Sequence, residues 1–214
     1  MGATEFSGKS ILICVAHQDD ETLFCGGLLT ALRGQADVNI ACFFRPAPGR
    51  KDTDTRCDAM ARVCADVGAR YLQYPFAVEP EHKRLRRHIS LSNEPAHIRE
   101  RPRRPIPEHP LYAVLNAAAL GAIRAYQPDV LITHNSVGEY GHREHILLHH
   151  AVIAAAATAG VGQTYVFGHG LQEGGVRVDY NIAAKNRLFQ HYLPQWDGVA
   201  LYDFALKDER FIPV

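Results

Sequence analysis

The residues best suited to chemistry lie near the N-terminus, where a histidine and two adjacent carboxylates occur within residues 16–21, AHQDDE. They follow the apolar run of residues 10–15, which is typical of a buried strand. In an open α/β sheet, ligands bind where such strands end. Neighbouring ionised acids repel each other unless a cation or hydrogen bonds compensate them, so this cluster indicates a metal site.

A second group of such residues occurs at 134–145, HNSVGEYGHREH. It also follows a predicted strand, at 129–133, and leads into a predicted helix. Because parallel strands end at the same edge of a sheet, the two segments can meet although they are far apart in the sequence.

The spacing within both segments suits a metal ion. His17 and Asp20 are three residues apart across a strand-to-helix turn, and His142 and His145 are three apart on a first helical turn. Catalytic zinc sites use three protein ligands and leave one position for water. His17, Asp20 and one downstream histidine would supply them, and Asp19 could then take a proton from that water.

Each feature alone has a simpler structural explanation. A histidine at a strand end is often only hydrogen bonded, and acids at a helix start often cap it. The histidines at 142, 145, 149 and 150 could form an exposed helix face. The occurrence of both segments at one predicted edge favours the metal site.

Strand and helix patterns alternate along the chain. This alternation predicts a single α/β domain over residues 1–214, with a doubly wound, mostly parallel sheet. The predicted strands are 10–16, 38–44, 70–74, 129–133 and 164–167, and the predicted helices are 20–34, 53–67, 111–126, 142–159 and 183–191.

Residues 78–110 break the alternation and are rich in proline and basic side chains. A segment of this length without periodicity is typical of a functional loop or of disorder. We expect a loop or lid insertion that contacts an anionic substrate or a partner subunit; a solvated surface loop is the simpler alternative.

Composition excludes several classes of protein. The 23 basic and 23 acidic residues balance, which argues against a nucleic-acid partner, and no apolar run is long enough to span a membrane. The five cysteines form no CxxC pair, which favours buried thiols in a reducing, cytoplasmic location. Nothing in the sequence indicates an oligomeric state.

Both motifs resemble those of the LmbE-like or PIG-L-like zinc-dependent N-acetylglucosaminyl deacetylases. The family's first motif, [AP]HPDDE followed by a glycine pair, corresponds to residues 16–21 with Gly26 and Gly27. Its second motif, GHPDH, corresponds to residues 141–145, GHREH. Lys185 and the segment HYLPQ at 191–195 are similar to a C-terminal family segment.

The resemblance implies a Rossmann-like fold without a dinucleotide, and a bound Zn²⁺, although Fe²⁺ also suits such ligands. The metal ligands would be His17, Asp20 and His145, and Asp19 would be the general base. The remaining roles would be stabilisation of the oxyanion or protonation of the amine by His142, orientation of His142 by Glu144, carbonyl polarisation by Tyr140 and substrate contact by Arg56.

The chain also departs from the family pattern. Gln18 replaces a proline, Glu144 replaces an aspartate, and residues 43–46, FFRP, replace the family's TDG. These changes leave the metal chemistry intact and affect the substrate pocket.

The resulting hypothesis is a hydrolase that removes an N-acetyl group from an amino sugar or glycoconjugate, with an anionic substrate favoured by the basic loop. Three alternatives stay open: an amidase acting on a non-sugar N-acyl substrate, a non-catalytic metal- or sugar-binding module, and a nucleotide-binding domain without metal.

Overall fold

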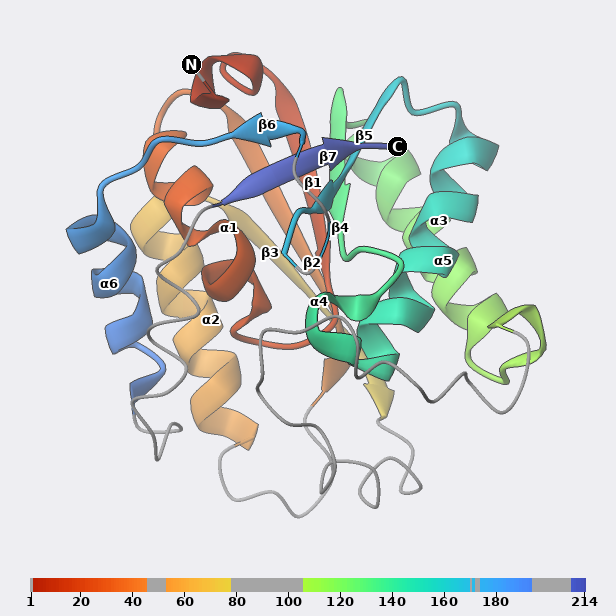
Figure 1. The fold of residues 1–214 in the computed structure, drawn as a ribbon. Helices are drawn as coiled ribbons and strands as arrows, with labels where there is room; N and C mark the ends of the chain where they lie inside the picture. The colour runs from red at the N-terminus through yellow and green to blue at the C-terminus, as the bar shows by residue number, and fades with distance from the viewer. Residues whose placement is uncertain (1, 46–52, 78–105, 170, 172–173, 194–208) are drawn as a thin grey trace.

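The residues that the structure describes are built around a seven-stranded sheet with the order β3-β2-β1-β4-β5-β7-β6 (Figure 1). The computed structural model describes residues 2–45, 53–77, 106–169, 171, 174–193 and 209–214. The strands are β1 (Ser10–Val15), β2 (Asp37–Arg45), β3 (Arg70–Ala77), β4 (Val130–Thr133), β5 (Gln163–Phe167), β6 (Val176–Arg177) and β7 (Arg210–Pro213). The helices are α1 (Asp20–Ala31), α2 (Thr53–Val67), α3 (Tyr112–Tyr126), α4 (Gly138–Gly141), α5 (Arg143–Ala159) and α6 (Ile182–Gln190), with the 3-10 helices η1 (Gly2–Glu5) and η4 (Ile106–Glu108).

Strands β1 to β5 are parallel, and β1 is hydrogen bonded to β2 on one side and β4 on the other. The strand order reverses direction at β1. In doubly wound sheets, the crevice beyond the carboxyl ends of the strands at this point is where ligands bind. The fold therefore brings the segments after β1 and β4 next to each other.

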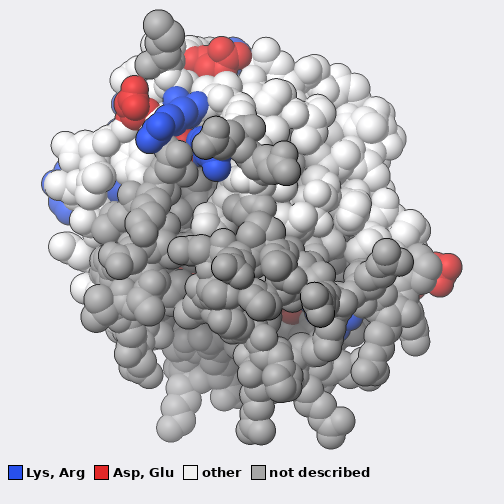
Figure 2. Space-filling view, viewed as in Figure 1, with Lys and Arg blue, Asp and Glu red and all other residues white. Residues whose placement is uncertain are grey.

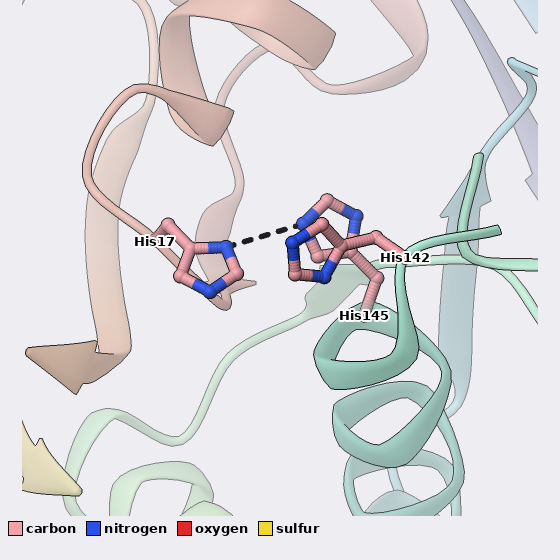
Figure 3. Close-up of side chains that lie close together, drawn as sticks. All are labelled: His17, His142 and His145. Atoms are coloured by element: carbon pink, nitrogen blue, oxygen red, sulfur yellow. Dashed lines mark hydrogen bonds between the residues drawn. The ribbon is translucent and has the colours of Figure 1, made fainter. Parts of the chain in front are cut away.

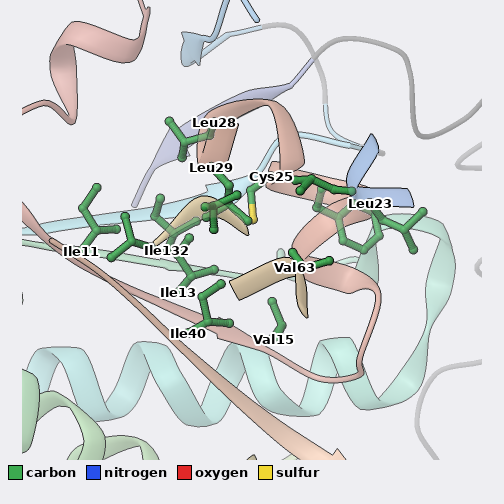
Figure 4. Close-up of a cluster of buried hydrophobic side chains, with 14 of the residues drawn as sticks. Ile11, Ile13, Val15, Leu23, Cys25, Leu28, Leu29, Ile40, Val63 and Ile132 are labelled. Atoms are coloured by element: carbon green, nitrogen blue, oxygen red, sulfur yellow. The ribbon is translucent and has the colours of Figure 1, made fainter. Parts of the chain in front are cut away.

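Helices cover both faces of the sheet (Figure 1). One core lies between the sheet and α1, α2 and α6, and includes Ile11, Ile13 and Val15 of β1 (Figure 4). The other core lies under α3 and α5 and includes Leu12 and Cys14. Because β1 is buried on both faces, its sequence is a continuous apolar run rather than an alternating one.

The predicted α/β class and mostly parallel sheet are confirmed, with corrections at the boundaries. The strand predicted at 70–74 continues to Ala77, and the helix predicted at 20–34 ends at Ala31. Strands β6 and β7 were not predicted; they add an antiparallel edge and are too short to show a pattern. The separate helix α4 was also missed, because Gly138 and Gly141 disfavour helix in the sequence.

Most of the basic, proline-rich segment lies outside the described residues; of its last part, 106–108 form η4. None of the helices in the described part of the chain has the length and apolarity needed to cross a membrane. On the face shown in Figure 2, several basic and acidic side chains lie near one another at the upper left, and others of both signs show at the right and lower down, in keeping with the balanced composition.

Candidate metal centre

The turn after β1 places His17 and Asp20 on one side of the site. The backbone N–H of His17 donates to Oδ2 of Asp20 at 2.7 Å, which folds the turn back on itself. Asp19 adopts a φ of 109°, a left-handed conformation that few non-glycine residues occupy. Asp20 then starts α1, and its side chain is almost completely buried.

The segment after β4 supplies the opposite side. Gly138 and Glu139 both have positive φ values, of 65° and 60°, and turn the chain sharply before α5. His142 is the N-cap residue of α5 and His145 lies in its first turn. Their rings stack with centroids 4.4 Å apart, and both face His17 (Figure 3).

Three ligand atoms converge between these two segments. Nδ1 of His17 lies 3.3 Å from Nε2 of His145 and 3.5 Å from Oδ2 of Asp20. Nε2 of His145 lies 3.4 Å from the same Asp20 oxygen. Ligand atoms around a tetrahedral zinc ion, with bonds of about 2.0–2.1 Å, are roughly 3.3–3.4 Å apart. The three side chains are therefore already spaced as a zinc ion requires.

Two buried glutamates fix the histidine rings in this orientation. Oε2 of Glu139 lies 2.6 Å from Nδ1 of His145, and Oε2 of Glu144 is hydrogen bonded to Nε2 of His17. In each ring, the other nitrogen is left facing Asp20. A carboxylate behind a metal-binding histidine sets the tautomer and orientation that coordination needs.

The charges in this cluster are strongly coupled. Burial would raise the pKa of Asp20, but His145, His134 and His17 hold it well below its usual range. Burial would lower the pKa of His17, but Glu144 and Asp20 raise it to about 9. A metal ion entering the site would displace a proton from this histidine.

His134, the first residue after β4, belongs to a second group of side chains that could hold a metal, with Asp20 and His145. Nε2 of His134 lies 3.3 Å from Oδ2 of Asp20 but also accepts the backbone N–H of Ala16 at 2.9 Å. Its Nδ1 faces Glu139 at 2.9 Å. The backbone N–H of Ala16 already uses the lone pair of Nε2 of His134, which is the nitrogen that faces Asp20, so His17 is better placed than His134 as the third ligand.

Asp19 is held from several directions beside these ligands. Nη2 of Arg56 lies 2.5 Å from Oδ2 of Asp19 and also donates to the carbonyl of Gln18. The backbone N–H of Asp19 donates to Oε2 of Glu21 at 3.0 Å. The other oxygen of Glu21 accepts the hydroxyl of Tyr192 at 2.5 Å. These contacts stabilise the left-handed backbone and orient the carboxylate.

The remaining predicted site residues line the same region. The ring of Tyr140 is 5.6 Å from that of His145, and burial together with the carboxylates of Asp20 and Asp19 raises the pKa of Tyr140. Burial, and then His145 and His17, lower the pKa of His142 well below its usual value. Oε2 of Glu144 is 3.9 Å from Nδ1 of His142, so Glu144 contacts His17 more closely than His142.

Three further residues belong to the site and were not predicted from the sequence: His134, Glu139 and Tyr192. Burial would raise the pKa of Glu139, but His134 and His145 hold it at about 2, so this carboxylate stays ionised. The position of His134 directly after a buried strand could have predicted that it lies at the site. No sequence pattern predicts the hydrogen bond from Tyr192 to Glu21, because 171 positions separate the two residues.

Comparisons with known proteins find a matching family and a curated relative. The sequence matches the family described as PIG-L, GlcNAc-PI de-N-acetylase, over residues 12–156. A curated relative, the 1D-myo-inositol 2-acetamido-2-deoxy-alpha-D-glucopyranoside deacetylase of Tsukamurella paurometabola, is 27% identical over 181 residues. That alignment covers 72% of this chain and 58% of the relative, so the chain spans less than two thirds of its length.

Solved structures share the fold at low sequence identity. The zinc-inhibited form of teicoplanin deacetylase Orf2 has a TM-score of 0.65 at 14% identity, over 91% of this chain and 90% of that one. GalB, the 4-carboxy-2-hydroxymuconate hydratase of Pseudomonas putida KT2440, has a TM-score of 0.59 at 14% identity, over 92% and 82%. The family match covers more than half of the chain, which therefore belongs to the PIG-L family.

Proposed function

We propose that this chain is a metal-dependent N-deacetylase, which hydrolyses the acetamide of an amino sugar or glycoconjugate to acetate and a free amine. The observation that carries the proposal is the triangle formed by Nδ1 of His17, Oδ2 of Asp20 and Nε2 of His145, with sides of 3.3–3.5 Å. Family membership and a curated relative that deacetylates an acetamido sugar support it.

His17, Asp20 and His145 would hold the metal, which we propose to be zinc, with iron(II) as a second possibility for the same donors. When bound, such an ion acidifies water and polarises a carbonyl oxygen. A neighbour of the same fold has a zinc-inhibited form, which supports zinc as an ion that a protein of this fold can bind.

Asp19 would accept the proton of the attacking water. Its carboxylate is adjacent in sequence to Asp20 and is oriented by Arg56 at 2.5 Å. Arg56 would therefore act on the general base, in addition to the substrate contact that the family resemblance implies. A carboxylate with its position fixed in this way needs little reorganisation when the proton moves.

His142 and Tyr140 would act on the amide itself. Tyr140 remains protonated because its pKa is raised, so its hydroxyl can donate to the carbonyl oxygen as negative charge develops there. His142 would stabilise the same oxygen or deliver the proton to the departing amine. Glu144 would support this group of histidines mainly through His17, which it contacts directly.

We propose an amino sugar carrying an anionic group as the substrate, from the basic character of residues 78–110.

A cytoplasmic location is also part of the proposal and rests on the five cysteines, all of which are free thiols. A hydratase shares this fold, so the proposed reaction rests on the site residues and the family rather than on the fold.

The direct test is acetate release from a panel of N-acetyl amino sugars, with and without phosphate, beside N-acyl substrates that carry no sugar. We expect release from the sugars, fastest from the phosphorylated members. Release only from non-sugar amides would favour the amidase alternative. Bound metal with no release from any substrate would favour a binding module.

A further inference from the structure

Helix α1 is broken in the middle. Cys25 has φ −143° and ψ 16°, outside the helical region, and divides α1 into a first part that begins with Asp20 and a second part that continues from Gly26 and Gly27. In a regular helix, the carbonyl of Leu23 would accept the N–H of Gly27. A break at this buried position leaves polar backbone groups that need other partners.

Two buried charged side chains provide those partners. Nζ of Lys185, in α6, donates to the carbonyl of Leu23 at 3.0 Å. Glu209, just before β7, accepts the N–H groups of Gly27 and Leu28 at 2.6 and 2.8 Å. Lys185 and Glu209 are themselves paired at 2.5 Å and are 0% and 3% exposed.

The charges match the dipoles of the helix parts they touch. The ammonium group of Lys185 lies at the carboxyl end of the first part, where the helix dipole is negative, and Glu209 lies at the amino end of the second part, where it is positive. The ion pair thus occupies the gap in the helix with the orientation that electrostatics favours.

The glycine pair allows this approach. A Cβ atom on Gly26 would lie 3.2 Å from Cγ of Lys185, and one on Gly27 would lie 2.3 Å from the ring of Tyr180. That ring is 5.3 Å from Nζ of Lys185 and helps to enclose it. The absence of side chains at Gly26 and Gly27 therefore lets Lys185 of α6 and Tyr180, just before α6, pack closely against α1.

We propose that the Lys185–Glu209 pair is a positioning device for the metal site, which holds the first part of α1 at the angle that points Asp20 toward His17 and His145. Replacing a buried ion pair by apolar side chains often costs no stability, so stability alone does not account for this one. The inference rests on the metal site proposed above, because Asp20 is the ligand that this part of the helix carries.

The test compares zinc affinity with fold stability in variants of the pair. Glu209→Gln keeps the volume and one acceptor oxygen, and Lys185→Met keeps the length of the side chain. Zinc affinity is measured by competition with a chromophoric chelator, and thermal unfolding is measured on the metal-free proteins. We expect each variant to bind zinc about tenfold more weakly than the wild type at temperatures where it is folded.

The control variant is Leu188→Ala, which removes buried side-chain volume from the same helix and leaves both charged groups of the pair in place. We expect it to lower the melting temperature and to leave zinc affinity within twofold of the wild type. If the pair variants bind zinc as tightly as the wild type, or if Leu188→Ala weakens binding equally, the proposal is wrong. Should a single variant not fold, Lys185→Met/Glu209→Leu is judged by the same criteria.

These outcomes are distinguishable from failure of the metal site itself. A wild-type protein that binds no zinc would contradict the proposed function. A wild type that binds zinc, together with pair variants that bind it equally well, would contradict only the positioning role of Lys185 and Glu209.

Discussion

Oε2 of Glu139 lies 2.6 Å from Nδ1 of His145, so a buried carboxylate determines which ring nitrogen of this histidine faces Asp20. The same oxygen is 2.9 Å from Nδ1 of His134. The conformation of Glu139, with φ 60° and ψ −65°, is unfavourable for a residue with a side chain, and the three contacts that its carboxylate makes offset this cost.

Glu139→Gln should weaken metal binding. The amide keeps the shape of the side chain but loses the charge that orients the histidines, and loss of such a partner typically lowers metal affinity about 10–100-fold. Equilibrium dialysis against buffered zinc measures the effect, with Glu108→Gln, an exposed glutamate, as the control. Unchanged affinity in Glu139→Gln would show that His145 does not depend on this carboxylate.

The Asp19→Asn variant should still bind metal but should release acetate much more slowly than the wild type. Asparagine tolerates the positive φ at this position, so the backbone is retained while the proton acceptor is lost. We expect acetate release to fall by roughly two to four orders of magnitude, the usual contribution of a general base. Metal content and rate are measured on one preparation; full activity in this variant would refute the role of Asp19.

Tyr192→Phe should lower turnover from a distance. It removes only the hydroxyl that donates to Glu21, whose other oxygen holds the backbone N–H of Asp19. We expect kcat to fall on the order of tenfold, about 1.4 kcal/mol in the barrier, with little change in KM. Tyr165→Phe is the matched control, because its hydroxyl contacts Glu5 instead. Equal effects of the two substitutions would contradict the role of Tyr192 in orienting Asp19 through Glu21.

His169→Gln should reduce the decrease in the free energy of unfolding that the protein shows in mild acid. Burial lowers the pKa of His169 from 6.5 to about 4. Between these values the unfolded chain takes up a proton that the folded chain does not, so stability falls as pH decreases through this window and is unaffected above it. We expect a wild-type loss from this group of less than ~3 kcal/mol, which is absent in the variant.

Urea unfolding of both proteins at pH 7 and pH 4.5 measures that difference. The wild type should lose more stability than His169→Gln over this interval, after both are corrected for their values at pH 7. Parallel losses in the two proteins would mean that His169 titrates normally in the folded state.

Much of this architecture follows from local sequence. The run of β1 is apolar at every buried position because both of its faces are covered, and this places His17 and Asp20 at the strand end. The parallel arrangement then brings in His142 and His145. These steps depend on hydrophobic periodicity and on the alternation of strands and helices along the chain, which can be recognised in the sequence.

Other parts depend on contacts that a single sequence does not display. The break at Cys25 is stabilised by Lys185 and Glu209, which lie far away in the chain. Strand β7, which pairs antiparallel to β5, is only four residues long, too few for a recognisable pattern. The ionised state of Glu139 depends on two histidine rings that only the fold brings to it.

Zinc titration of acetate release measures whether the three side chains His17, Asp20 and His145 hold a catalytic metal. The protein is freed of metal with a chelator, and release from an N-acetyl amino sugar is followed as zinc is added. We expect no release without metal and a maximum near one equivalent per chain, with none in His145→Ala at the same zinc concentration. Release that is indifferent to metal, or that persists unchanged in His145→Ala, would contradict this role of the three side chains.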